Sequence, residues 1–115
     1  MKNNIIKDKS FAFALRIIAL YSQLQENKEF VISKQLLRCG TSIGANINEA
    51  IAAESRADFI HKMAIASKEA RESLYWLELL HASNLKDFDY TLYIKECTEI
   101  VKILTNIVKS TKSNQ

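Results

Sequence analysis

The chain contains no proline and only two glycines among its 115 residues. Proline and glycine mark turns and helix ends, so their scarcity excludes a fold built from many short elements and tight turns. The regular alternation of polar and apolar residues that indicates β-strands is also missing. These absences predict long helices joined by few connections.

The chain also has only two cysteines, Cys39 and Cys97, which form neither a CxxC pair nor a Cys/His cluster. This excludes a disulfide framework and a zinc site, and we expect free, buried thiols in a reducing compartment. The apolar segment 11–21 is interrupted by Arg16 and is too short to span a membrane. We therefore expect a cytoplasmic protein that does not contact a membrane.

What is present is the composition of one folded domain, residues 1–115, with 48% hydrophobic and 25% charged residues. The spacing of apolar residues predicts four helices, at about 8–27, 33–54, 56–83 and 88–110. Because the connections are short, consecutive helices must be antiparallel. The sequence thus predicts an all-α, up-down-up-down antiparallel four-helix bundle.

Each predicted helix carries one apolar face. The expected core positions are Phe11, Leu15, Ile18 and Tyr21 in the first helix; Leu36, Cys39, Ile43, Ile47 and Ala50 in the second; Phe59, Met63, Ala66, Ala70, Leu74, Leu77 and Leu80 or His81 in the third; and Leu92 or Tyr93, Cys97, Ile100, Leu104 and Ile107 in the fourth. We expect Ser33 and Ser55 to be N-caps, and Asp87 or Asp89 to open the last helix.

Both glycines, Gly40 and Gly44, lie in the segment CGTSIGANINEA, residues 39–50. A phosphate-binding loop is one interpretation, but no strand precedes the segment and no GK[ST] follows it. The apolar pattern of the second helix continues through both positions. Since each helical glycine costs roughly 1 kcal/mol relative to alanine, we expect a surface where another helix backbone approaches closely.

Two further patterns suggest contacts beyond the core. Arg38, Ser42, Asn46 and Glu49 form a polar stripe on the second helix, which favours either a hydrogen-bonded network between helices or subunits, or plain solvent exposure. The segment LYWLELL, residues 74–80, is apolar nearly all round. It predicts a subunit interface formed by Tyr75, Trp76 and Leu79, or else a large core layer around the tryptophan.

The residues that carry chemistry in other bundles do not form a site in this sequence. Glu78 and His81 have the Glu-x-x-His spacing of di-metal bundles, but a second such pair on another helix is missing. The sequence also lacks a GxSxG-type nucleophile motif. We therefore predict no catalytic residue, no metal and no cofactor.

Three segments, RCGTSIGANINEA (38–50), ESRADFIHK (54–62) and KEARESLYWLELL (68–80), resemble the 23S rRNA-intervening sequence proteins. The same superfamily includes the accessory variability protein of diversity-generating retroelements. Within the first segment, Ser42, Ile43, Asn46, Ile47 and Glu49 match the pattern S-I-x-x-N-I-x-E. The resemblance implies a four-helix bundle that assembles as a ring, typically a homopentamer. It also implies a nucleic-acid or reverse-transcriptase partner and no enzymatic activity.

The net charge is +3, and no acidic residue follows Glu99. Basic residues at the chain ends and on the helices are candidates for contacts with RNA or DNA phosphates: Lys2, Lys7, Lys9, Arg38, Arg56, Lys102, Lys109 and Lys112. We expect a non-catalytic oligomeric bundle that binds nucleic acid through basic surfaces. The alternative is a structural protein–protein interaction module with no nucleic-acid role.

Overall fold

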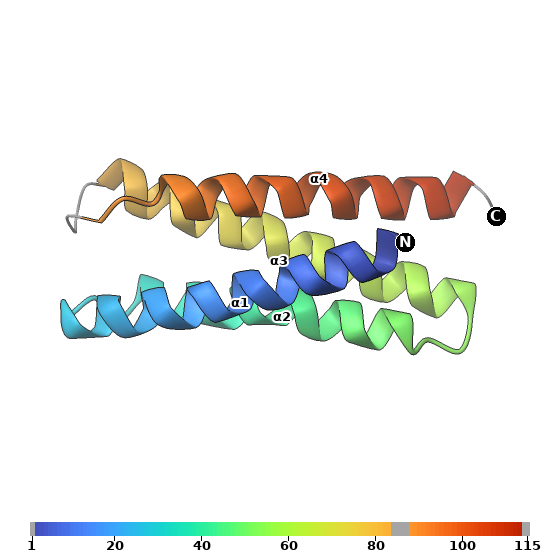
Figure 1. The fold of residues 1–115 in the computed structure, drawn as a ribbon, viewed down its shortest axis with the longest axis horizontal. Coiled ribbons are helices and arrows are strands. Elements are labelled where there is room, and N and C mark those ends of the chain that lie inside the picture. The colour runs from blue at the N-terminus through green and yellow to red at the C-terminus, as the bar shows by residue number, and fades with distance from the viewer. Residues whose placement is uncertain (1, 84–87, 114–115) are drawn as a thin grey trace.

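The computed structural model describes residues 2–83 and 88–113. Its helices are α1 (Lys2–Glu26), α2 (Ile32–Ile51), α3 (Arg56–Ser83) and α4 (Thr91–Ser113). They lie along the long axis of a molecule that measures 47 × 21 × 20 Å, and successive helices run in opposite directions (Figure 1). The predicted all-α antiparallel bundle is confirmed.

The helices pack in chain order around the core. α2 packs against α1 and α3, and α4 packs against α3 and less extensively against α1. The start of α1, the end of α4 and the α2–α3 connection lie at one end of the bundle (Figure 1). Compared with the predicted ranges, α1 starts earlier, α2 ends earlier, and α4 is shifted toward the C-terminus.

Isoleucine and leucine fill most of the core between the helices. On α2, all five predicted core positions are buried, because steps of three and four keep them on one side of the helix. Most predicted positions of α3 and α4 are buried as well. The exceptions are Phe59, Leu74 and Tyr93, which are half-buried, and His81 and Leu92, which are exposed.

The predicted core face of the first helix is wrong. Phe11, Leu15 and Ile18 are 65%, 55% and 49% exposed, and Tyr21 is half-buried. The residues that α1 buries in the core are instead Ile6, Phe13, Ile17, Leu20 and Leu24. Helix α1 therefore has two apolar faces, and the one predicted to be core is exposed in the single chain.

The two glycines lie where α1 and α2 approach closely. A Cβ atom at Gly40 would stand 3.0 Å from Cγ2 of Ile17, and one at Gly44 would stand 3.3 Å from the hydroxyl oxygen of Ser10. The first distance is shorter than van der Waals contact allows, so a larger residue would push the helices apart. The whole segment 39–50 is helical, which excludes a phosphate loop and agrees with the expected packing role.

Two of the predicted helix caps are present. The hydroxyl oxygen of Ser55 accepts a hydrogen bond from the backbone N–H of Asp58 at 3.1 Å, at the start of α3. A carboxylate oxygen of Asp89 accepts one from the backbone N–H of Thr91 at 3.0 Å, at the start of α4. Asp87, the alternative cap for α4, lies outside the described residues.

The start of α2 differs from the prediction. Ser33 lies inside the helix and is not its N-cap. The buried carboxylate of Glu29 accepts hydrogen bonds from the backbone N–H groups of Ile32 and Ser33, at 2.8 and 2.9 Å. The longer side chain of a glutamate in the connection thus satisfies the first amides of the helix, as a serine cap would have done.

Candidate functional site

The basic residues predicted to contact nucleic acid are spread over several surfaces. Two of them form ion pairs within the chain: Lys9 with Glu99 at 3.3 Å, and Arg38 with Glu72 at 2.7 Å and Glu69 at 3.5 Å. Neighbouring carboxylates offset these charges, which weakens both residues as phosphate ligands.

The remaining predicted residues differ in position. Lys2 begins α1, and its side chain lies outside what the structure describes; Arg56 begins α3; Lys7 lines a groove between α1 and α2; and Lys102 is exposed on α4. Lys109 and Lys112 line a second groove, between α3 and α4. This second groove is the place where the structure brings predicted basic residues together.

The α3–α4 groove, with a volume of about 370 Å³, is lined by Ala64, Ser67 and Arg71 of α3 and by Thr105, Val108, Lys109 and Lys112 of α4. Its described lining thus contains three cations and two hydroxyl groups but no carboxylate. The guanidinium of Arg71 donates a hydrogen bond to the hydroxyl of Thr105 at 2.9 Å, which holds it across the two helices.

Sequence analysis did not identify Arg71 as a candidate. Arg71 follows Ser67 by four residues on α3, and Lys112 follows Lys109 by three on α4, so each helix presents its part of the groove on one face. Thirty-eight residues separate Arg71 from Lys109, and helical periodicity does not specify which faces of two helices meet. The sequence shows the basic face of each helix, but only the structure shows that these two faces lie side by side.

The predicted polar stripe of α2 follows the boundary with α3. At one end Arg38 pairs with α3, and at the other end the Glu49 carboxylate pairs with Lys62 of α3 at 3.0 Å. In the middle, the Ser42 hydroxyl donates to the carbonyl of Arg38 at 2.7 Å, and the Asn46 amide donates to the carbonyl of Ser42 at 2.8 Å. The stripe therefore bridges two helices at its ends and bonds to its own helix at its centre.

The contacts of Arg38 extend to an aromatic pair on α3. The indole N–H of Trp76 donates to the Glu72 carboxylate at 3.0 Å, and this bond, together with Arg38, lowers the pKa of Glu72. Trp76 is half-buried, and its ring meets that of Tyr75 edge to face with centroids 5.1 Å apart. Tyr75 and Leu79 are 57% and 37% exposed. The predicted interface residues are thus two outward apolar side chains beside an anchored tryptophan.

The described residues offer neither a cluster of metal ligands nor a membrane-spanning helix. In residues 2–83 and 88–113, no three His, Cys, Asp or Glu side chains gather as metal ligands would. Within the same ranges, no helix has both the length and the apolar character needed to cross a membrane. Burial raises the pKa of the Cys39 thiol to about 11 and that of the Cys97 thiol to about 12. Both thiols are neutral near pH 7, which makes them poor nucleophiles.

Comparison with known proteins identifies relatives by sequence and by fold. The model of the 23S rRNA-intervening sequence protein family matches residues 2–106. A crystal structure from Bacteroides thetaiotaomicron, described as a protein with unknown function from the S23 ribosomal protein family, is 56% identical. The match covers 95% of this chain and 99% of that chain, with a TM-score of 0.89. No curated protein matches the chain.

Proposed function

The chain belongs to the 23S rRNA-intervening sequence protein family, and we propose that it is a non-catalytic helical protein that binds nucleic acid through the basic α3–α4 groove. The observation that carries this proposal is the gathering of Arg71, Lys109 and Lys112 around one groove whose described lining contains no acid. Phosphate oxygens of a nucleic-acid backbone are the natural ligands of such a surface.

The shape of the groove favours backbone contacts over base recognition. The groove is shallow and shared by two rigid helices, and its described lining contains no aromatic ring on which a base could stack. Arg71 is held by Thr105, while the two lysines can adjust to phosphate positions. We therefore expect binding that tolerates sequence changes and depends mainly on charge.

The test compares two variants that remove the same amount of charge. The groove variant is Arg71→Gln/Lys109→Gln/Lys112→Gln. The control variant is Lys28→Gln/Lys34→Gln/Lys95→Gln, whose three residues are exposed elsewhere on the bundle. Binding to a labelled single-stranded RNA and to a DNA duplex is measured by fluorescence anisotropy at about 50 mM salt.

We expect the groove variant to bind at least about tenfold more weakly than the wild type, and the control variant to lose much less, since local phosphate contacts matter more than net charge. Equal losses in both variants would show that binding has no defined surface. Absence of wild-type binding to either probe would contradict the proposal.

The second candidate function is a protein-interaction module with no nucleic-acid role. The specific observation in its favour is the exposed apolar face of α1, because large exposed apolar surfaces usually mark protein contacts. A reverse transcriptase, the protein partner that the resemblance implies, would be one candidate for such a contact. The same titration separates the two functions, since a pure interaction module leaves both nucleic-acid probes unbound.

A further inference from the structure

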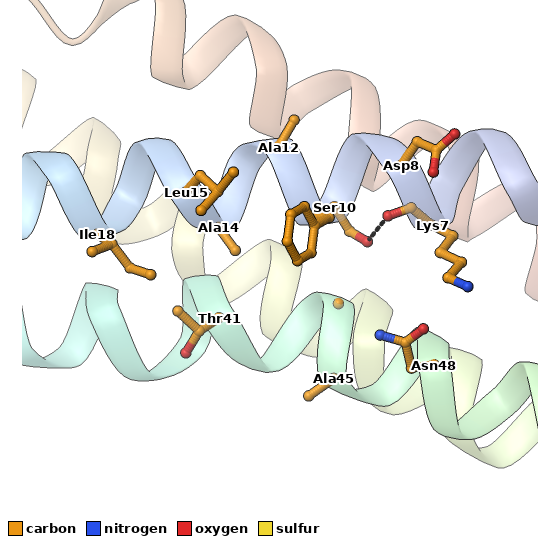
Figure 2. A pocket seen from close by; sticks show the side chains of 12 residues that line it. Lys7, Asp8, Ser10, Ala12, Ala14, Leu15, Ile18, Thr41, Ala45 and Asn48 are labelled. Atoms are coloured by element: carbon orange, nitrogen blue, oxygen red, sulfur yellow. Dashed lines mark hydrogen bonds between the residues drawn. The ribbon is translucent and has the colours of Figure 1, made fainter.

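Many hydroxyl groups on these helices bond to their own helix. The Ser73 hydroxyl of α3 donates to the carbonyl one turn earlier at 2.9 Å, and that of Thr111 in α4 does so at 2.6 Å. In the groove between α1 and α2, the Ser10 hydroxyl likewise donates to the carbonyl of Lys7 at 3.0 Å (Figure 2). Such a bond leaves a hydroxyl less able to bind a ligand, because its only hydrogen already has an acceptor.

Two hydroxyl groups of the α3–α4 groove lack such a bond. Ser67 is only 9% exposed, and in residues 2–83 and 88–113 its hydroxyl has no hydrogen-bond partner. The Thr105 hydroxyl accepts the hydrogen bond from Arg71, but within the same ranges it donates none. Buried polar groups in native proteins nearly always have a partner. These two hydroxyls are therefore available to a molecule that enters the groove.

The rim and the floor of this groove differ in chemistry. The rim consists of the three exposed cations, Arg71, Lys109 and Lys112. The floor is made of short side chains that are buried or half-buried: Ala64, Ser67, Thr105 and Val108. Long cationic side chains hold a phosphate at the rim, whereas the floor combines apolar groups with hydroxyls. Such a floor matches a sugar ring, which has both C–H and O–H groups, better than it matches a charged phosphate.

We propose that the floor of the α3–α4 groove contacts the ribose 2′-hydroxyl and thereby selects RNA over DNA, an inference that rests on the proposed binding of phosphates by the same groove. The cations do not make this choice, because the phosphates of both nucleic acids carry the same charge. A 2′-hydroxyl both donates and accepts, so it can pair with the Ser67 hydroxyl or accept the free hydrogen of Thr105. Deoxyribose has only C–H groups at this position and leaves the buried Ser67 hydroxyl without a partner.

The test compares the dissociation constants for RNA and DNA of one base sequence. The probes are labelled single strands of about 12 nucleotides that contain only A, C and G, so they differ only in their 2′-hydroxyls. Fluorescence anisotropy at about 50 mM salt should show that the wild type binds the RNA about three- to tenfold more tightly, as expected for one hydrogen bond to a buried hydroxyl. Ser67→Ala should reduce this ratio to nearly one.

Ser67→Ala should fold normally, because it removes a hydroxyl that has no partner in the described residues and introduces a better helix former. Circular dichroism checks this. The matched control is Ser110→Ala, an exposed serine of α4 outside the groove lining whose hydroxyl bonds to its own helix at 2.8 Å. This control should keep the wild-type ratio of the two dissociation constants.

The possible outcomes separate the sugar contact from phosphate binding. If the wild type binds both probes equally and the Arg71→Gln/Lys109→Gln/Lys112→Gln variant loses both, selection of RNA is overturned while phosphate binding by the groove stands. A Ser67→Ala variant that keeps the wild-type ratio overturns the contact between the floor and the ribose. A wild type that binds neither probe overturns the proposed function, and this inference with it.

Discussion

At the scale of single residues, Lys28 has a backbone conformation that glycine would adopt more easily. Its φ angle is 65°, in the left-handed region. Its N–H bonds to the carbonyl of Gln25 at 3.0 Å, and the N–H of Glu29 bonds to the carbonyl of Leu24 at 2.9 Å. This is the Schellman pattern that ends many helices, usually with glycine at the position of Lys28.

We predict that Lys28→Gly stabilises the protein by about 0.5–1 kcal/mol. The left-handed conformation costs a residue with a Cβ roughly 1–2 kcal/mol, and the greater freedom of glycine in the unfolded chain offsets part of the gain. Urea unfolding followed by circular dichroism measures the change. Asn27→Gly, one residue earlier, is the matched control and should destabilise. A Lys28→Gly variant less stable than the wild type would refute this explanation.

The two buried thiols predict how stability changes at alkaline pH. Burial raises the pKa of Cys39 from the ordinary value of 9.0 to about 11, and that of Cys97 to about 12. The folded chain therefore keeps its thiol protons in a range where the unfolded chain releases them. Their contribution to stability is fully present below pH 9 and is lost as the pH rises through about 11 for Cys39 and about 12 for Cys97.

At pH 10 the free energy of unfolding should therefore be lower than at neutral pH by about 1 kcal/mol per thiol. Urea unfolding at a series of pH values tests it, with Cys39→Ala/Cys97→Ala as the reference. The reference variant should lose less stability between pH 8 and 10 than the wild type, because the tyrosines and lysines titrate in both. Parallel pH profiles would mean that the thiols are not protected by burial.

At the scale of helices, α1 shows why a helix can be predicted correctly while the face assigned to the core is wrong. Its sequence contains two apolar stripes, one through Phe11, Leu15 and Ile18, the other through Phe13, Ile17, Leu20 and Leu24. Periodicity identifies both but does not say which one faces the core of the same chain. The choice depends on packing against α2, where Ile17 meets Gly40 and Ser10 meets Gly44. For α2, with a single apolar stripe, periodicity was sufficient.

The contact between α1 and α2 predicts different effects at the two glycines. Gly40→Ala should destabilise by about 1 kcal/mol, because its Cβ would stand 3.0 Å from the buried Ile17 and the overpacking exceeds the gain in helix propensity. Gly44→Ala should change stability by less than about 0.5 kcal/mol, since the Ser10 hydroxyl can give way. Gly44→Leu should cost roughly 1–3 kcal/mol. Thermal unfolding measures all three.

An increase in melting temperature for both Gly40→Ala and Gly44→Leu would contradict the close approach of α1 and α2. An increase for Gly44→Ala alone is compatible with it, because helix propensity then exceeds a small steric cost.

At the scale of the whole molecule, the sequence was sufficient for the helices and for the bundle, because four long periodic segments without proline leave few other arrangements. The sequence was not sufficient to predict which residues come together on a surface that two helices share. The α3–α4 groove combines Arg71 with Lys109 and Lys112, while Lys9 and Arg38, equally basic in sequence, are paired with carboxylates. Which cations are offset by acids depends on tertiary contacts that sequence spacing does not contain.

The salt dependence of nucleic-acid binding tests most directly whether the α3–α4 groove binds phosphates. If Arg71, Lys109 and Lys112 each displace counterions from a duplex, the slope of log K against log salt should be about −2.7, or roughly a 40-fold loss of affinity between 50 and 200 mM salt. Removing the three groove charges should flatten this slope by nearly its full value. A wild type that binds no nucleic acid at about 50 mM salt, or a slope that the groove variant leaves unchanged, would contradict the account.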